Sequence, residues 1–211
     1  MLPRLYAVCD ADVCARAGWT LPDYAAALMD GGVTLLQLRA KHASSREVLA
    51  ATEAVMARAL RHKATVIVND RADVARLADA SGVHVGQDDL APADVRRVIG
   101  EHAALGLSTH TTAQLESAVR EPVTYVAIGP VFGTTTKATG YDAVGLDLVR
   151  RASAIAAPSG LPVVAIGGIT LENAPDIIVS GAASVAVITD LLVGGDPTAR
   201  ARAFLEQLSC V

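Results

Sequence analysis

The chain has 211 residues, with 18 lysines and arginines against 22 aspartates and glutamates and a formal net charge of −4. A composition of 52% hydrophobic and 19% charged residues predicts a buried core and argues against intrinsic disorder. The mild acidity argues against a nucleic-acid surface, which needs clustered Lys and Arg, and no apolar run approaches the ~18 residues of a membrane span.

Eight short runs rich in leucine and β-branched residues recur along the chain and predict strands. They are apolar almost throughout rather than alternating, which is typical of parallel strands buried on both faces. The runs are Leu5–Cys9, Thr34–Leu38, Thr65–Val68, Val83–Val85, Ala104–Leu107, Tyr125–Ile128, Val163–Ile166 and Ser184–Ile188.

A longer stretch with helical periodicity follows each of these runs. The expected helices are Asp23–Asp30, Ser45–Leu60, Asp73–Ala80, Ala93–Ile99, Ala113–Arg120, Asp147–Ala154, Leu171–Ser180 and Thr198–Leu208. An alternating series of strands and helices predicts a parallel sheet with helices outside it. Eight repeats are the number that closes a (β/α)₈ TIM barrel, so we expect one such domain over residues 1–211. A doubly wound open sheet is the alternative.

Polar segments follow nearly every predicted strand. In a (β/α)₈ barrel, catalytic groups come from the carboxyl ends of the strands and the loops after them. The segments are 37–41, 69–71, 86–89, 108–111, 129–137, 167–169 and 189–190. A purely structural barrel has no need of such a polar rim.

Acidic and basic residues at this rim suggest a metal and phosphate site. Asp70 and Asp89 follow adjacent strands, and two carboxylates suit Mg²⁺, which takes few protein ligands besides substrate phosphates. The alternative for Asp89 is a helix cap. Arg39 and Lys41 follow an apolar strand and suit phosphate oxygens. The alternative is a salt bridge from each to a rim carboxylate.

Two loops have features of anion-binding sites. The segment 133–137 offers backbone N–H groups, threonine hydroxyls and Lys137, although a flexible threonine-rich loop is the alternative. Gly167 and Gly168 would let the backbone approach a phosphate, with an ordinary tight turn as the alternative. His110 is a candidate general base that ranks below Ser108, because rim histidines are more often hydrogen-bonded structural groups.

Six motifs, in this order, resemble the thiamine-phosphate synthase family. They are Gln37-Leu-Arg39-Ala-Lys41, Val68-Asn69-Asp70, His84-Val-Gly86-Gln87-Asp88-Asp89, Gly106-Leu-Ser108-Thr-His110-Thr111, Gly129-Pro130-Val-Phe132-Gly-Thr134-Thr-Thr136-Lys137 and Ala165-Ile-Gly167-Gly168-Ile169. The 19-residue spacing from Asp70 to Asp89 also matches the family.

The resemblance implies a Mg²⁺-dependent transferase that joins hydroxymethylpyrimidine diphosphate to thiazole phosphate by dissociative substitution, releasing diphosphate and forming thiamine phosphate. It implies that Asp70 and Asp89 hold Mg²⁺, and that Lys137, Arg39 and Ser108 are catalytic. The implied pyrimidine diphosphate ligands are Gln37, Arg39, Lys41, Asn69, Ser108 and Lys137, and the implied thiazole phosphate ligands are Thr134, Thr135, Thr136, Gly168, Ile188 and Thr189.

One departure from the family pattern follows the last strand. Thr189 stands where the family commonly has serine, and Asp190 adds a negative charge near the expected phosphate site. Three alternative functions stay open. A thiazole tautomerase would use a histidine at the position of Pro130, a sugar-phosphate epimerase would need groups placed for proton abstraction, and a non-catalytic barrel would have no need of the rim charges.

Targeting signals are not evident in this sequence. Asp10 and Asp12 interrupt any signal-peptide core, and the odd count of 3 cysteines without metal-ligand spacing fits a reducing compartment. We therefore expect a cytoplasmic enzyme that meets small-molecule substrates and neither nucleic acid nor membrane. The sequence leaves the oligomeric state open, a homo-oligomer included.

Overall fold

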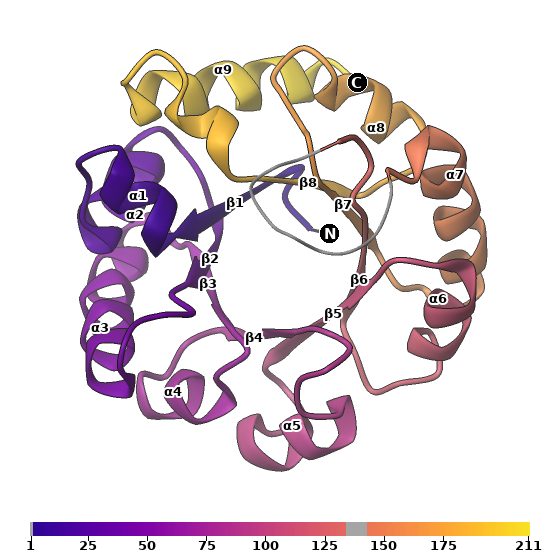
Figure 1. Cartoon of the computed structure of the whole chain (residues 1–211), viewed down its shortest axis with the longest axis horizontal. Coiled ribbons are helices and arrows are strands. Elements are labelled where there is room, and N and C mark those ends of the chain that lie inside the picture. The colour runs from indigo at the N-terminus through magenta and orange to yellow at the C-terminus, as the bar shows by residue number, and fades with distance from the viewer. Residues whose placement is uncertain (1, 134–142) are drawn as a thin grey trace.

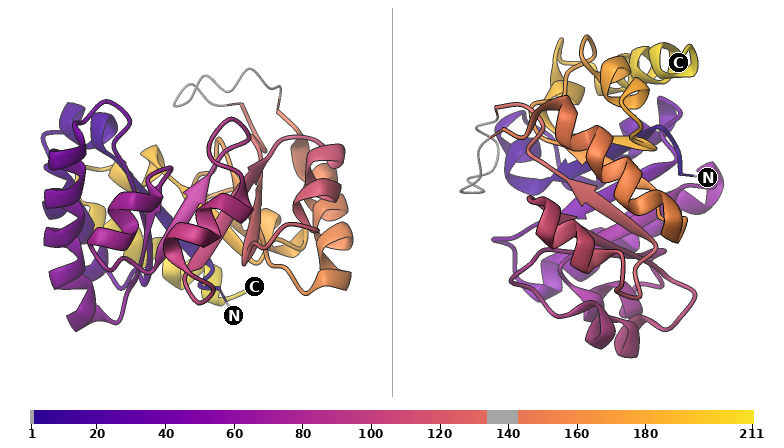
Figure 2. Two further views of the ribbon diagram at one scale, coloured as in Figure 1. Left: turned by 90° about the horizontal axis from the view of Figure 1, so that it is seen from below. Right: turned by 90° about the vertical axis from the view of Figure 1, so that its right-hand side faces the viewer.

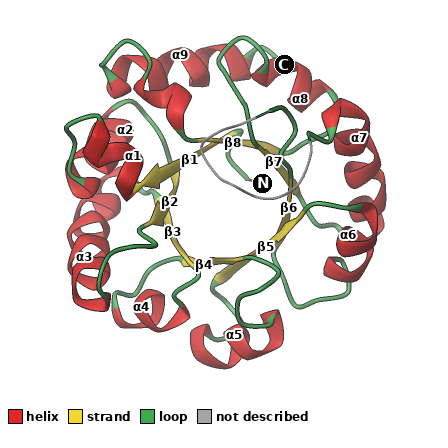
Figure 3. Ribbon diagram, viewed as in Figure 1, coloured by secondary structure: helices red, strands yellow, loops and turns green. Residues whose placement is uncertain are grey.

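The structure, a computed structural model, describes residues 2–133 and 143–211 of the chain. Eight parallel strands form a closed barrel in the order of the sequence, and the first strand pairs with the last (Figures 1 and 3). The strands are β1 (Leu5–Asp10), β2 (Leu35–Arg39), β3 (Thr65–Asn69), β4 (Gly82–Val85), β5 (Ala104–Thr109), β6 (Tyr125–Ile128), β7 (Val163–Ile166) and β8 (Ser184–Val187). The expected (β/α)₈ barrel is confirmed, and the open doubly wound sheet is excluded.

Helices surround the ring of strands (Figures 1 and 2). They are α1 (Ala11–Arg16), α2 (Leu21–Asp30), α3 (Ser45–His62), α4 (Ala72–Leu77), α5 (Pro92–Ile99), α6 (Thr112–Ala118), α7 (Gly145–Ala156), α8 (Ala174–Val179) and α9 (Pro197–Ser209), with 3₁₀ turns η1 (Ala157–Ser159) and η2 (Thr189–Leu192). Helix α9 packs beside α2 and closes the ring, and Thr198 Oγ1 donates to the carbonyl of Ala27 at 2.9 Å. In the described ranges, no helix has the length and apolar character that a bilayer span requires.

Helix α3 illustrates how the local sequence sets the bounds of an element. Ser44 and Glu47 form a capping box, in which Ser44 Oγ accepts from the Glu47 N–H and Glu47 Oε2 accepts from the Ser44 N–H. Lys63 ends the helix with a left-handed φ of 51°. The start agrees with the prediction from sequence, and the end lies two residues beyond the predicted Leu60.

Two apolar cores lie on the two faces of the barrel wall. Alternate residues along a strand point to opposite sides, so Leu36 packs towards the helices while Leu35 belongs to the core inside the barrel. The interior core also contains Tyr6 and Tyr125, and both rings are almost fully buried. Because these side chains fill the interior, a site has room only near the barrel mouth.

Several elements differ from the sequence prediction, and two of these differences lie near the barrel mouth. Helix α1 was not expected, because Asp10 both ends β1 and caps a helix of only six residues that shows no periodic apolar stripe. Helix α8 begins at Ala174 rather than at the predicted Leu171. Residues 170–173 instead form a turn in which Asn173 Oδ1 accepts from the Thr170 N–H at 2.9 Å.

Candidate active site

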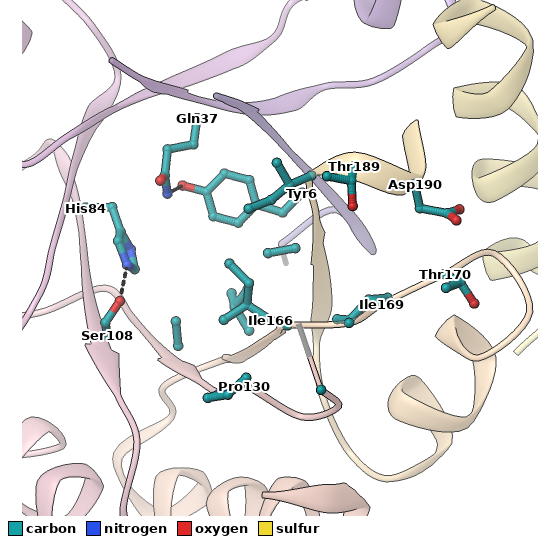
Figure 4. Close-up of a pocket in the computed structure, with 18 of the residues that line it drawn as sticks. Tyr6, Gln37, His84, Ser108, Pro130, Ile166, Ile169, Thr170, Thr189 and Asp190 are labelled. Carbon is teal, nitrogen blue, oxygen red and sulfur yellow. Dashed lines mark hydrogen bonds between the residues drawn. The ribbon is translucent and has the colours of Figure 1, made fainter. Parts of the chain in front are cut away.

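A cavity of about 370 Å³ lies at the carboxyl ends of the strands. Its walls come from the strand ends and from the turns that follow β6, β7 and β8. Figure 4 shows Gln37, His84 and Ser108 gathered on one side of the cavity and Thr189 and Asp190 on the other. The cavity therefore lies at the end of the barrel where the sequence predicts the chemistry.

Two carboxylates and an ammonium group meet beside the ends of β3 and β4. Lys41 Nζ lies 3.0 Å from Asp70 Oδ2, and the Asp89 side chain is a hydrogen-bonding neighbour of Asp70. Burial, together with Asp89, raises the pKa of Asp70 above its ordinary value, and Lys41 lowers it in part. The two carboxylates thus approach one another, as their positions after adjacent strands predict.

Asp89 does not cap the helix that follows it. Helix α5 has Ala91 at its N-cap position and no side-chain cap hydrogen bond. Asp89 Oδ2 instead accepts from the backbone N–H of Gly86 at 2.7 Å. The carboxylate therefore turns back towards the end of β4, on the side where Asp70 lies.

Each cation of the β2 end is paired with a carboxylate of the rim. The Arg39 guanidinium forms an ion pair with Asp10 at the end of β1, and Lys41 pairs with Asp70 after β3. These are the salt bridges that the sequence left open as an alternative. Because β2 lies between β1 and β3 in the barrel, the two ion pairs lie on either side of β2, and each carboxylate holds its cationic group at the mouth.

The turn after β7 has the backbone geometry expected for close approach to a ligand. Gly167 and Gly168 have φ values of +105° and +63°, in the region that favours glycine. A Cβ on Gly168 would lie 2.7 Å from the carbonyl oxygen of Gly133 and from Cβ of Phe132. Asn173 Nδ2 donates to the Gly168 carbonyl at 3.0 Å and fixes the turn. Only glycine fits this turn without displacing its neighbours.

The turn after β8 lines the same cavity, and the negative charge of its Asp190 is compensated by Arg200. Ile188, Thr189 and Asp190 line the cavity, and most of the Asp190 side chain is buried. The Asp190 carboxylate pairs with Arg200 at 2.6 Å and accepts from the Leu171 N–H at 3.1 Å. In Figure 4 this carboxylate points away from Tyr6, so the negative charge expected near the phosphate site is directed into a structural contact.

Several predicted site residues lack a structural description or a specific contact. Thr134, Thr135, Thr136 and Lys137 lie outside the described residues, so their roles stay predictions. Asn69 is buried at the end of β3 and pairs in register with a residue of β4.

His84, which lies between two valines of β4, is buried, as its place in an apolar strand predicts, and it also lines the cavity. Its Nε2 lies 2.8 Å from Ser108 Oγ, and its Nδ1 lies 3.0 Å from the Tyr125 hydroxyl. Gly106 pairs in register with His84 and with Tyr125, on the strand between them. A glycine inside an apolar strand is typical of close approach by neighbouring groups, and this signal was available in the sequence.

His110 lines the cavity with one ring nitrogen committed to the backbone. Its Nδ1 donates to the carbonyl of Gly129 at 2.6 Å, because a carbonyl can only accept. Its backbone N–H donates to Gln114 Oε1 at 2.7 Å. This is the hydrogen-bonded structural arrangement that is more common for rim histidines than a role as general base.

The chemistry of the carboxylate pair fits a magnesium ion. Among the described residues, no group of three or more His, Cys, Asp or Glu side chains could hold a metal ion. Asp70 and Asp89 are a pair of neighbouring carboxylates that could contribute two ligands. Mg²⁺ is typically held by one or two carboxylates, with water and phosphate oxygens at its other positions. A half-buried pair of like charges is also costly unless a cation compensates it.

The closed barrel and the polar groups at its carboxyl mouth define the class of protein. It is a (β/α)₈-barrel enzyme that acts on small-molecule substrates.

Comparisons with known proteins identify the family. A family model described as thiamine monophosphate synthase matches residues 5–191. Thiamine-phosphate synthase of Koribacter versatilis is 48% identical over 209 residues, covering 98% of this chain and 96% of that protein. Thiamine-phosphate synthase of Chloroflexus aurantiacus is 43% identical and covers 94% and 89%. Thiamine phosphate pyrophosphorylase from Pyrococcus furiosus superimposes with a TM-score of 0.86 at 25% identity, covering 98% and 96%. The chain belongs to the thiamine-phosphate synthase family, whose members are transferases of thiamine biosynthesis.

Proposed function

We propose that the chain condenses hydroxymethylpyrimidine diphosphate with thiazole phosphate, releasing diphosphate and forming thiamine phosphate. The observation that carries the proposal is that two different anion-suited regions lie at the carboxyl end of the barrel, where the cavity is. One region is the cluster of rim charges around Lys41 and Asp70, and the other is the pair of turns at Gly168 and Thr189. Two substrates that each carry phosphate need two such regions with an apolar space between them.

The pyrimidine diphosphate is assigned to the side of the cavity formed by β2 to β5. Gln37 and Ser108 face the cavity, while Arg39 and Lys41 bring positive charge to its rim. We also assign Asn69, which ends β3, to this substrate. Lys137, which lies outside the described residues, completes the predicted set.

The thiazole phosphate is assigned to the turns after β7 and β8. Gly168 has a positive φ, and because glycine has no side chain, its backbone is accessible at the cavity wall. Thr189 adds a hydroxyl. Ile188 supplies apolar contact beside them. The predicted ligands Thr134, Thr135 and Thr136 lie outside the described residues, in the segment that begins after Gly133.

Asp70 and Asp89 would hold Mg²⁺ in this assignment. When bound, the ion would supply positive charge to the diphosphate of the pyrimidine substrate. Lys41, which lies 3.0 Å from Asp70, keeps an ammonium group at the same place. Arg39 would add a planar guanidinium that can contact two phosphate oxygens at once.

The reaction then follows a dissociative order. The bond between the pyrimidine methylene carbon and the diphosphate oxygen breaks first, and the thiazole nitrogen captures the resulting cation. Arg39, Lys41 and Lys137 stabilise the charge that grows on the departing diphosphate, and Ser108 contributes a hydroxyl at the reacting side. Preorganised contacts of this kind are each worth roughly 2–4 kcal/mol of the barrier. The reaction requires no protein nucleophile.

The same proposal places the chain as one barrel domain in the cytoplasm. Its support is that Cys9 and Cys14 are buried without a disulfide and Cys210 is exposed and free, as is typical of proteins from a reducing compartment.

The direct test is to incubate the protein with both substrates, with and without Mg²⁺, and to measure thiamine phosphate and diphosphate. We expect equal amounts of the two products, and we expect that removing Mg²⁺ abolishes both. Absence of thiamine phosphate when both substrates and Mg²⁺ are present would refute the proposal. Isomerisation of thiazole phosphate alone, without condensation, would instead identify a tautomerase.

A further inference from the structure

A chain of hydrogen bonds between side chains crosses the interior of the barrel below the cavity. Gln37 Nε2 donates to the Tyr6 hydroxyl at 3.0 Å, and the Tyr6 and Tyr125 hydroxyls lie 2.9 Å apart. The Tyr125 hydroxyl lies 3.0 Å from His84 Nδ1, and His84 Nε2 lies 2.8 Å from Ser108 Oγ. Five strands thus contribute one side chain each, and the two end residues are those assigned to the pyrimidine diphosphate. Figure 4 shows both ends of this chain at the cavity.

Packing holds the middle of this chain in one arrangement. The Tyr6 and Tyr125 rings are 1% and 2% exposed and meet edge to face with centroids 5.9 Å apart. The His84 ring stacks on Tyr125 at 5.6 Å. Gly106 lies in register between His84 and Tyr125, and a Cβ at this position would collide with both rings. The rings therefore have little freedom to turn away from one another.

The direction of the hydrogen bonds follows from the amide at one end. Since Gln37 donates to Tyr6, the single hydrogen of Tyr6 is directed to Tyr125, and that of Tyr125 is directed to His84 Nδ1. Burial raises the pKa of both phenols well above the usual value, so both hydroxyls keep their hydrogens. His84 then carries its proton on Nε2 and donates it to Ser108 Oγ.

We infer that Tyr6, Tyr125 and His84 are positioning residues, which fix the donor and acceptor roles of the two polar groups at the cavity. Because Ser108 Oγ accepts from His84, its own hydrogen points to substrate, and because one amide hydrogen of Gln37 is directed to Tyr6, the Gln37 carbonyl oxygen points away from Tyr6 and is available to accept. The inference rests on the proposed function, which assigns Ser108 and Gln37 to one substrate.

The hydrogen bonds between Gln37 and Ser108 could also run in the opposite direction, and this alternative would reverse the role of the Ser108 hydroxyl. If the Gln37 amide were rotated by half a turn, its oxygen would accept from Tyr6, and every hydrogen in the chain would reverse. His84 would carry its proton on Nδ1, and the Ser108 hydrogen would be directed to His84 Nε2. Ser108 could then no longer donate to a phosphate oxygen or a ring nitrogen of the substrate.

Nuclear magnetic resonance of the histidine nitrogens distinguishes the two directions in the intact protein. Two-bond ¹H–¹⁵N correlation spectra of ¹⁵N-histidine-labelled protein show which ring nitrogen carries the proton. The signals of His84 among the 5 histidines are assigned by their loss in His84→Gln. We expect a neutral ring protonated at Nε2 near pH 7. A ring protonated at Nδ1, or a cationic ring, would overturn the inference.

A double-mutant cycle tests whether the series of hydrogen bonds acts through Ser108. Tyr125→Phe is expected to lower kcat/KM about tenfold and to remove the defined His84 tautomer, since the hydrogen bonds of Tyr125 to Tyr6 and to His84 are both lost. Combined with Ser108→Ala, it should cause a smaller loss than in the wild-type background, because the part that acts through Ser108 is already absent. Additive losses would mean a merely structural role and would overturn the inference.

Tyr24→Phe is the matched control for this substitution. Tyr24 is a buried tyrosine of α2, and its hydroxyl has no hydrogen-bond partner within the described part of the chain. This variant should keep the His84 signals and the wild-type kcat/KM. If the wild type forms no thiamine phosphate, the proposed function fails, whereas an active wild type with the other His84 tautomer refutes only the positioning chain.

Discussion

Replacing Asp70 with asparagine separates the role of this carboxylate in metal binding from its role in the fold. Asp70 has a φ of +63°, and asparagine is among the residues that adopt this conformation most readily, so Asp70→Asn should keep the turn after β3. The carboxylate is 21% exposed and lies beside Asp89. Burial and that neighbouring charge disfavour its ionised form, while Lys41 offsets only part of the cost. The metal-free variant should therefore be as stable as the wild type or slightly more stable.

The magnesium-bound state should respond in the opposite way. At Mg²⁺ ten times its Kd, binding to the folded wild type adds about 1.4 kcal/mol to the free energy of unfolding. For a chain of 211 residues this corresponds to a rise in Tm of about 3–6 °C. Asp70→Asn should lose most of this rise, and its kcat should fall about 10²–10³-fold, on the scale of one lost electrostatic contact in the transition state.

The assay is thermal unfolding with and without Mg²⁺, followed by steady-state kinetics on the same preparations. Asp73→Asn is the matched control, because Asp73 lies three residues further on, in the first turn of α4, and its ion pair with Arg71 is solvent-exposed. The control should keep the Mg²⁺-dependent rise in Tm and the wild-type kcat. A full rise in Tm together with full activity in Asp70→Asn would refute the assignment of the metal.

Three further substitutions test the other parts of the site. Gly168→Ala forces a side chain into a φ of +63°, so we expect about 1–2 kcal/mol lower stability and at least a tenfold higher KM for thiazole phosphate, measured by denaturant unfolding and initial rates. Arg39→Ala should lower kcat about 10²-fold and leave the KM for thiazole phosphate unchanged; an effect confined to that KM would place Arg39 in the other subsite. Asp190→Asn weakens the ion pair with Arg200 and should cost about 2–3 kcal/mol of stability and raise the KM for thiazole phosphate. Tighter binding of thiazole phosphate in this variant would mean that the charge of Asp190 repels the substrate.

The strands could be predicted from the sequence because each is buried on both faces. Strands β6 and β7 match the predicted Tyr125–Ile128 and Val163–Ile166 at both ends. Their apolar runs stop where the chain leaves the barrel wall, so composition alone marks the boundaries. Helix α1 could not be recognised in this way, because six residues make less than two turns and give no periodic stripe.

The grouping of the rim charges was partly predictable. Parallel strands place their carboxyl ends at one mouth, so Asp70 and Asp89 were expected to meet there. Which cation pairs with which carboxylate depends on the directions of long side chains, and these depend on tertiary packing. The sequence therefore left a salt bridge from Arg39 to a rim carboxylate open but did not identify Asp10 as its partner.

The hydrogen-bonded side chains below the cavity are the part of the site that is hardest to recognise from the sequence. A histidine between two valines in an apolar strand is typical of the core, and nothing in that local pattern shows which face of the barrel wall it occupies. The face is set by the register between neighbouring strands, in which His84, Gly106 and Tyr125 occupy one level. Register follows from barrel closure, so it becomes visible only when the strands are placed together.

The central claim is that groups from separate strands converge on one metal–diphosphate complex at the barrel mouth. Anomalous diffraction from Mn²⁺, in crystals grown with Mn²⁺ and diphosphate, would locate the ion and its anion directly. The account predicts one ion between the carboxylates of Asp70 and Asp89, with the diphosphate against Arg39 and Lys41. An ion bound elsewhere in the barrel, or a diphosphate held only at the turns after β7 and β8, would contradict it.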